Sequence, residues 1–246
     1  SLDEVQKAVI RTHDLAIIRN PYVILGVVVI IMLGVISISK MPKRAKNDNP
    51  GSAINSFKRL IKNSKYREGV FAQLFYVASQ IMCWTFIIQY AGNLGISKAA
   101  AQNYNIVAMS IFLSSRFIST FLMKYINSRK LLTIFAVCAM ATTSGVILIE
   151  GIKGLYLLIA TSAFMSLMFP TIYGIALHGL SEEDSTLGAA GLVMAIVGGA
   201  LMPVLQGSII DMENIGTFDA VNISFILPFI CFCFIAIYGY RTWKVH

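Results

Sequence analysis

Long apolar stretches separated by short polar ones dominate the sequence. Seven segments each approach the roughly 20 apolar residues that a bilayer-spanning helix needs, at residues 22–39, 70–91, 105–123, 131–149, 154–177, 187–210 and 221–240. The gaps between them are short, except for a gap of about thirty residues after the first segment. The pattern predicts an all-α protein, a polytopic transmembrane helix bundle with about seven spans.

The long gap, residues 40–69, is strongly basic and holds nine of the twenty Lys and Arg residues. Its second part repeats Ile54, Phe57, Leu60 and Ile61 at helical spacing with lysines between them, which predicts a basic amphipathic helix on the membrane surface. If this loop is cytoplasmic, fourteen basic residues lie inside and five outside. The C-terminus is then cytoplasmic and the N-terminus external.

The composition excludes several classes of protein. With 57% apolar and 13% charged residues, the chain is not an ordinary soluble enzyme, a disordered chain or a disulfide-built secreted domain. The net charge of +8 follows from the topology, so no nucleic-acid partner is expected, and the lipid bilayer is the expected surrounding. The four cysteines lie in apolar runs without metal-ligand spacing, and no nucleophile–base set stands out. We expect no metal, no prosthetic group and no enzymatic activity.

One face of the segment 70–91 carries the candidate chemistry. Gln73, Tyr76, Gln80 and Trp84 are spaced by three, four and four residues, which places them within roughly 80° of one another on a helix. Amides exchange hydrogen bonds with hydroxyls in both directions, and an aromatic face packs on sugar-ring C–H groups. Gln80 lies near mid-span, where transporters bind their substrates. The stripe predicts a monosaccharide site, and interhelical hydrogen bonding remains the alternative, above all for Gln73 and Tyr76.

Other residues are candidates for conformational change. Arg116 is the only charged residue well inside a predicted span; it either reaches toward the headgroups or latches onto an acid or a helix C-terminus in one transport state. Pro170 and Pro203 are expected to bend their helices. Gly198 and Gly199 permit close backbone approach, so we expect packing and a hinge there.

The segment 154–177 adds two aromatic candidates to the proposed cavity. Phe169 and Tyr173 flank Pro170 one turn apart, and plain packing is the alternative for Phe169. No span interior contains Asp, Glu, Lys or His, so no proton-relay residue is predicted in this chain. The absence of a lysine in the last span also argues against a retinal protein.

Four motifs carry a resemblance to a known family. FAQLFYVASQIMCWTFIIQY, SSRFISTFLMKY, SAFMSLMFPTIYGIAL and LVMAIVGGALMPVLQGSIID resemble the second half of the L-fucose/proton symporter family of the major facilitator superfamily, and the similarity covers residues 15–240. The resemblance implies two six-helix bundles that rock about a central sugar site. It implies that Gln80 and Trp84 contact the sugar and that Arg116 belongs to the cytoplasmic half of the C-terminal bundle. The coupling ion would be a proton, handled by an Asp and a Glu of an N-terminal bundle that this chain lacks.

The sequence departs from that family at one position. Where the family carries a cavity tyrosine, this chain has Phe169, with Tyr173 one turn later. Carriers of glucose/galactose or of an amino sugar therefore stay open as alternatives to L-fucose, although the related glucose/galactose carriers tend to have Glu in place of Gln in the stripe and to lack its Trp. A non-transporting seven-span sensor or receptor is the alternative from another class.

The expected organisation has three parts in a bacterial inner membrane. Residues 1–39 form an external loop and the last helix of an N-terminal bundle, since no signal-peptide core precedes the first span. Residues 40–69 form a basic cytoplasmic linker, and residues 70–246 form the C-terminal six-helix transport bundle. On this interpretation the chain begins partway through a larger protein.

Overall fold

The computed structural model describes residues 19, 23–35, 37–38, 50–212 and 219–244. The chain forms two compact units, Ser1–Asp48 and Asn49–His246. In the first unit the described part is an apolar helix, Val23–Val35, with residues 37 and 38 also helical. This helix lies within the first predicted span, 22–39. Residues 22, 36 and 39 of that span fall outside the described residues, as does the preceding predicted external loop apart from residue 19.

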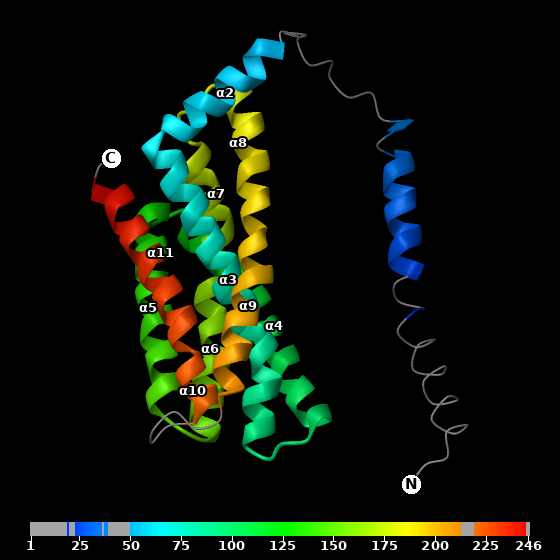
Figure 1. The fold of residues 1–246 in the computed structure, drawn as a ribbon, viewed down its shortest axis with the longest axis vertical. Helices are drawn as coiled ribbons and strands as arrows, with labels where there is room; N and C mark the ends of the chain where they lie inside the picture. Colours follow the sequence, from blue (N-terminus) through cyan, green and yellow to red (C-terminus); the bar gives the residue numbers. More distant parts are fainter. Residues whose placement is uncertain (1–18, 20–22, 36, 39–49, 213–218, 245–246) are drawn as a thin grey trace. The chain divides into compact units, whose positions relative to one another are not determined.

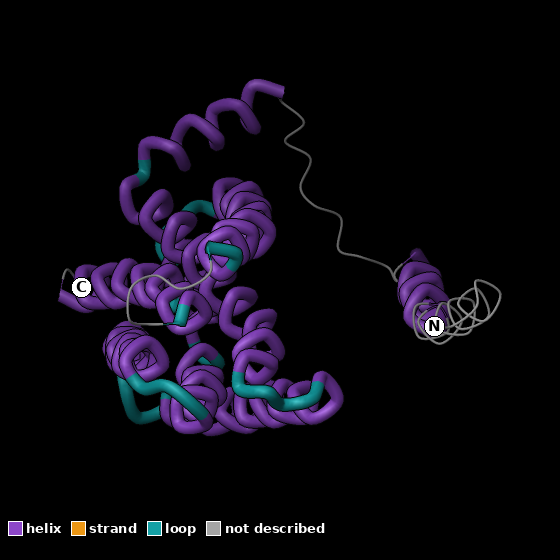
Figure 2. The backbone as a smooth tube through the Cα atoms, turned by 60° about the horizontal axis from the view of Figure 1, so that its bottom comes forward, coloured by secondary structure: helices purple, strands orange, loops and turns teal. Residues whose placement is uncertain are grey.

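Six long apolar helical segments of the second unit confirm the remaining six predicted spans. They are α3 (Ser64–Asn93), α4 (Lys98–Leu122), α5 (Ser128–Leu148), the pair α6 (Ile152–Met165) and α7 (Met168–Leu177), the series α8 (Glu182–Met194), η1 (Ala195–Val197) and α9 (Gly198–Ile210), and the pair α10 (Ala220–Ser224) and α11 (Ile226–Lys244) (Figure 1). The residues that the structure describes contain no strand, as the tube in Figure 2 also shows. The prediction of an all-α transmembrane bundle is therefore confirmed.

Several helices begin earlier than the apolar pattern predicts, because polar capping residues start them. The side chain of Asn63 accepts hydrogen bonds from the backbone N–H groups of Lys65 and Tyr66, so α3 begins at Ser64 and not at residue 70. The same residue separates α3 from α2 (Pro50–Lys62). The structure therefore divides the predicted basic amphipathic helix at Asn63, into α2 and the start of α3. The prediction of one continuous helix in the second part of the 40–69 gap was wrong. Ile54, Phe57 and Ile61 of α2 are exposed while Leu60 is buried, as the pattern indicates.

Three of the six spans are interrupted. The break between α6 and α7 lies at Ser166 and Leu167, and Ser166 is the residue whose carbonyl the ring of Pro170 would meet in a continuous helix. Pro170 itself lies in the first turn of α7, where proline is tolerated. Pro203, in contrast, lies inside the continuous helix α9, and the irregular turn precedes it at η1. The change of helix type in this span is therefore at Ala195–Val197, directly before Gly198, and not at Pro203.

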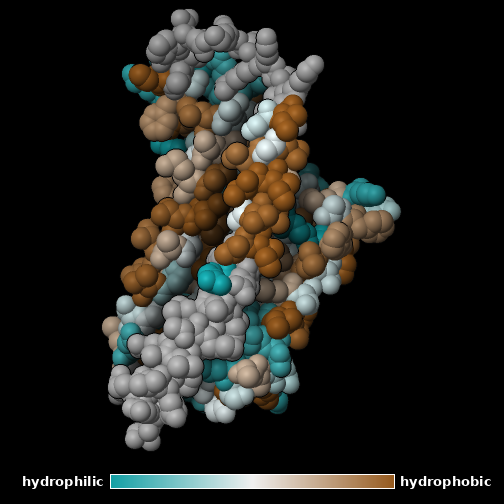
Figure 3. All heavy atoms as spheres, turned by 90° about the vertical axis from the view of Figure 1, so that its right-hand side faces the viewer, coloured by the Kyte–Doolittle hydropathy of each residue, from teal (hydrophilic) through white to brown (hydrophobic). Residues whose placement is uncertain are grey.

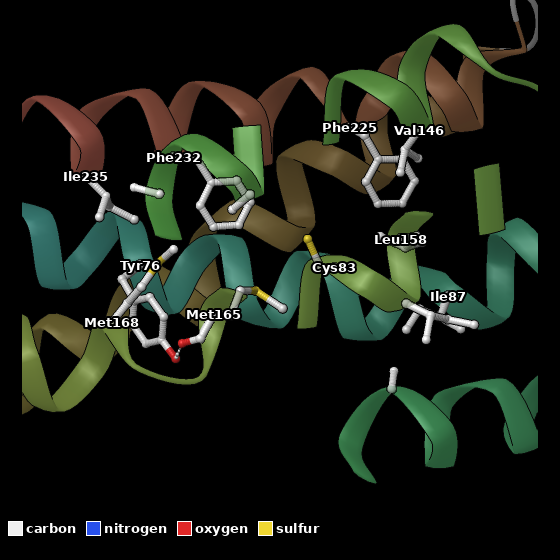
Figure 4. Close-up of a cluster of buried hydrophobic side chains, with 14 of the residues drawn as sticks. Tyr76, Cys83, Ile87, Val146, Leu158, Met165, Met168, Phe225, Phe232 and Ile235 are labelled. Atoms are coloured by element: carbon white, nitrogen blue, oxygen red, sulfur yellow. Dashed lines mark hydrogen bonds between the residues drawn. The ribbon is translucent and has the colours of Figure 1, made fainter. Parts of the chain in front are cut away.

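The core of the second unit surrounds α3, which contacts α4, α6, α7, α9 and α11. Buried apolar side chains from α3, α5, α6 and α11 meet there, with Tyr76, Leu158, Phe232 and Ile235 among them (Figure 4). The outer faces of α4 and α9 remain apolar and exposed. Figure 3 shows one face of the molecule with its hydrophobic residues in brown. Such faces suit contact with lipid chains or with a second helix bundle.

Polar contacts define the two ends of this unit. Arg241, near the end of α11, pairs with Glu68 in the second turn of α3 at 3.2 Å, and Arg129 donates to the backbone carbonyl of Thr242 at 3.4 Å. We call this end, which also includes α2, the basic end. At the opposite end the Asn93 amide donates to Asp219 at 3.1 Å.

Candidate functional site

The polar stripe on α3 is divided by burial into two parts. Gln73 and Tyr76 are fully buried, whereas Gln80 and Trp84 are partly exposed. The four residues share one face of the helix, and Tyr76 on that face contacts Met165 of α6 and Phe169 of α7. Only Gln80 and Trp84 lie where a ligand could reach them without a change in packing.

Tyr76 connects α3 to the break in the neighbouring span. Its hydroxyl donates to the backbone carbonyl of Met165, the last residue of α6, at 3.1 Å (Figure 4). The ring also meets Phe169 edge-on, with 6.0 Å between the centroids. This placement favours the interhelical interpretation of Tyr76, because the bond satisfies a carbonyl that the interrupted helix leaves without its usual donor.

Gln73 lies one turn closer to the basic end. Both polar atoms of its side-chain amide are buried and have no hydrogen-bond partner within the described residues. An unpaired buried amide costs roughly 1–3 kcal/mol. Gln73 therefore occupies a packed position in this conformation, with the hydrogen-bonding groups of its side chain unused.

Trp84 is held between α4 and α6. Its indole N–H donates to Ser162 Oγ at 3.3 Å, and its ring packs edge-to-face on Phe112 with the centroids 5.0 Å apart. Because contacts with two helices fix the indole, the exposed part of the ring has a defined orientation toward a ligand. The stripe alone did not identify Phe112, because the periodicity of one helix does not show which residue of another helix packs against Trp84.

Gln80 lies one turn before Trp84. Its side chain makes no hydrogen bond to the described part of the chain, and it is partly exposed. An amide in this state keeps its N–H groups and its carbonyl oxygen for a ligand. Gln80 and Trp84 together therefore provide hydrogen-bonding groups and a fixed aromatic ring at mid-span.

The aromatic candidates of α7 continue from Tyr76. Phe169 and Tyr173 are stacked, with 6.4 Å between ring centroids and 11° between planes, and both are partly buried. The structure thus brings Tyr76, Phe169 and Tyr173 into one aromatic row. Pro170, between them in sequence, is exposed.

Arg116 lies on the same face of α4 as Phe112, one turn closer to the basic end. Its side chain is exposed and forms no ion pair within the described residues. A guanidinium exposed in a span is costly unless it finds a partner or the interface, so the latch and the headgroup interpretation both remain open.

Gly198 and Gly199 lie against α3. A methyl group on Gly198 would collide with the backbone oxygen of Leu74, and one on Gly199 would come within 3.0 Å of Val77. These glycines therefore permit the close approach of α9 to α3, next to the irregular turn η1. Within the described residues, no three His, Cys, Asp or Glu side chains are grouped as metal ligands would be.

Comparison with known protein families shows to which family this chain belongs. The model of the Major Facilitator Superfamily matches residues 12–203, which is most of the chain. The chain belongs to this superfamily. Its helix order, interrupted spans and glycine-rich contact between α9 and α3 are thus features of a superfamily member.

Curated superfamily members extend the similarity. An L-fucose-proton symporter of Haemophilus influenzae is 60% identical over 249 residues, which is 100% of this chain and 57% of that protein. An L-fucose-proton symporter of Escherichia coli is 31% identical over 92% of this chain and 52% of its own length. A glucose/galactose transporter of Brucella abortus is 29% identical over 90% of the chain. The chain therefore spans about half of the length of the curated relatives it matches.

Solved structures agree with the family. A crystal structure of the major facilitator transporter FucP in the outward conformation aligns with a TM-score of 0.80 and 27% identity, covering 98% of this chain and 58% of that one. A second structure, of the Escherichia coli fucose:proton symporter, gives a TM-score of 0.79. The fold is therefore that of the major facilitator superfamily, as the resemblance implies.

Proposed function

We propose that this chain forms a transport bundle of a proton-coupled sugar symporter, and that its substrate is L-fucose. The observation that carries the proposal is the pair Gln80 and Trp84, both partly exposed at mid-span, with the Trp84 ring held by Ser162 and Phe112. The 60% identity to a protein named as an L-fucose-proton symporter supports the choice of substrate. The site acts by binding and orienting the sugar, and no chemical step is needed.

The transport cycle requires a second bundle. Gln80 and Trp84 are partly exposed in this unit, and the matched relatives are much longer than the matched part. We therefore propose that a further bundle completes the cavity and that the two bundles alternate access to it. A titratable group of that bundle would take the coupling proton, because the middle of each described span lacks Asp, Glu, Lys and His.

The orientation follows from the charge distribution. The basic end gathers residues from 58–67 together with Arg129, Lys130 and Arg241. By the positive-inside rule this end faces the cytoplasm. On this proposal the protein lies in a bacterial inner membrane, residues 1–39 end in the last helix of the other bundle, and residues 40–69 connect the two.

The chemistry of Phe169 bears on which sugar is bound. L-fucose is 6-deoxy-L-galactose, so it carries a methyl group where L-galactose carries a hydroxymethyl group. Phe169 offers an apolar surface and no hydroxyl, which is compatible with that methyl group but does not by itself select L-fucose. The similarity to a glucose/galactose transporter makes galactose the second candidate.

Equilibrium binding of labelled L-fucose to the purified intact transporter tests the proposal. Gln80→Ala and Trp84→Ala should each weaken binding roughly tenfold, as expected for a lost hydrogen bond or ring contact near 1.4 kcal/mol. Gln89→Ala is the matched control, because Gln89 is an exposed amide near the end of the same helix. D-galactose and D-glucose should compete much less well than L-fucose.

Three results would contradict the proposal. Unchanged affinity in both site variants would reject the site, even if transport occurs. Stronger competition by D-galactose than by L-fucose would reject the substrate while leaving the site. Uptake that does not respond to collapse of the proton gradient would reject the coupling.

A further inference from the structure

A polar cavity opens at the basic end, within the second unit and away from the sugar site. Its volume is about 710 Å³, and it lies between the start of α3, the start of α5 and the ends of α7 and α11. The side chains that matter for its chemistry are Lys65, Glu68, Arg129, His178, Tyr238 and Arg241. No residue of the predicted sugar site contributes to it.

The cavity carries an excess of positive charge. Lys65, Arg129 and Arg241 contribute three cations, and Glu68 contributes the one carboxylate. Glu68 is already engaged, since it pairs with Arg241 at 3.2 Å. Arg129 makes a long bond of 3.4 Å to the Thr242 carbonyl, so most of its N–H groups stay available. The cavity therefore suits an anion that several cations can share.

An apolar groove continues from this cavity between α3 and α11. It has a volume of about 460 Å³ and shares Glu68, Tyr238 and Arg241 with the polar cavity. Its remaining lining is entirely apolar: Phe71, Ala72, Phe75, Phe234 and Ile237. From Glu68 to Phe75 the groove follows two turns of α3, or about 10 Å at the usual rise of a helix.

Three of the apolar side chains that line the groove are exposed, and two of its aromatic rings are stacked on each other. Phe71, Phe234 and Ile237 are more than half or about half exposed. Phe75 and Phe234 are stacked at 4.6 Å between ring centroids, and they bridge α3 and α11. A linear apolar chain could therefore lie along the groove with its polar end near Arg241.

We propose that the cavity and the groove together bind one anionic phospholipid, with its phosphate near Lys65, Arg129 and Arg241 and part of an acyl chain between α3 and α11. The order of the two surfaces, basic at the interface and apolar toward the bilayer, matches the order of the groups in a lipid. Basic pockets between transmembrane helices are suited to anionic headgroups. The lipid would bridge α3, which carries the sugar site, to the last helix of the bundle. The proposal does not depend on which sugar is transported.

Native mass spectrometry of the purified intact transporter tests the headgroup. Titration with phosphatidylglycerol should give a saturable single site, bound roughly tenfold more tightly than phosphatidylethanolamine with the same acyl chains. The double variant Lys65→Gln/Arg241→Gln should weaken phosphatidylglycerol binding by roughly tenfold or more. Lys130→Gln is the matched control, because Lys130 lies at the same end but lines neither cavity. Equal losses of phosphatidylglycerol affinity in the double variant and in Lys130→Gln would overturn the proposal. They would indicate a general electrostatic attraction between the anionic lipid and the basic end, without a specific binding site.

A second pair of variants tests the groove without touching the charges. Ile237→Ser changes an exposed residue of the groove, and Ile230→Ser changes an exposed residue of α11 outside it. Ile237→Ser should weaken phosphatidylglycerol binding several-fold, whereas Ile230→Ser should leave it unchanged, with melting temperatures compared for both. If inorganic phosphate displaces the lipid fully and Ile237→Ser has no effect, the cavity is a soluble-anion site and the proposal is wrong.

Discussion

Arg59 of α2 forms a bidentate ion pair with Asp184 in the first turn of α8. Arg59 Nη2 donates to Asp184 Oδ1 at 2.8 Å and Nε donates to Oδ2 at 3.1 Å. The same guanidinium donates to Ser56 Oγ at 2.8 Å, and Ser181 Oγ accepts from the Asp184 N–H at 3.2 Å. The amphipathic helix is thus attached to a transmembrane helix by directed polar contacts, while its exposed apolar residues remain available to lipid.

A double-mutant cycle measures this attachment. Arg59→Gln and Asp184→Asn should each destabilise the fold, and the double variant should lose less stability than the sum of the two single variants, because the bidentate pair is already broken in each of them. The free energy of unfolding in detergent is the quantity to compare. Lys58→Gln combined with Asp184→Asn serves as the control, and its effects should add. A cycle in which the Arg59 and Asp184 effects also simply add would show that the pair contributes nothing.

Removal of the Tyr76 hydroxyl tests whether this residue stabilises the fold or binds the sugar. Tyr76→Phe should lower the free energy of unfolding by about 1 kcal/mol, since the Met165 carbonyl loses its buried donor. Affinity for L-fucose should stay within roughly twofold of the original, because Tyr76 is fully buried. Parallel measurements of unfolding and sugar binding decide the matter. A large loss of affinity at unchanged stability would return Tyr76 to the sugar site.

The sequence was sufficient to predict the spans, because crossing a bilayer sets the length and polarity of each helix. It was not sufficient to divide the stripe on α3. Periodicity places Gln73, Tyr76, Gln80 and Trp84 on one face, but which part of that face is covered depends on where α6 and α7 pack. That packing depends on the break between α6 and α7 at Ser166. The presence of Pro170 in the sequence predicts a bend in this span but does not show at which residue the helix is interrupted.

The cavity at the basic end was also beyond prediction from the sequence. Its charged residues come from positions 65, 68, 129 and 241, on three different helices. A hydropathy pattern treats each of them only as a residue that flanks a span. Their convergence depends on the way the ends of α3, α5 and α11 meet, which short-range sequence signals do not encode.

Arg116 offers a test between its two interpretations. If it latches onto an acid in one transport state, Arg116→Gln should slow sugar uptake roughly tenfold or more, the effect of about 1.4 kcal/mol on one state, while sugar affinity changes little. If it only reaches the headgroups, Arg116→Gln should behave like Lys124→Gln, the control at the end of α4. Initial uptake rates in proteoliposomes, with binding measured alongside, distinguish the two. We expect the latch, because Arg116 lies on the face of α4 that carries Phe112 and thus toward Trp84.

The contact between α9 and α3 predicts opposite effects for two glycines of the same helix. Gly198→Ala should destabilise the fold by roughly 1–3 kcal/mol, because the added methyl group meets the backbone oxygen of Leu74, which cannot move without displacing α3. Gly207→Ala should be neutral or stabilising by up to about 1 kcal/mol, since its nearest neighbour, Phe86, is 4.0 Å away and alanine favours the helix. Melting temperatures of the two variants provide the measurement. Equal melting temperatures would mean that the hinge region yields to the methyl group, and the close approach of α9 would then not limit stability.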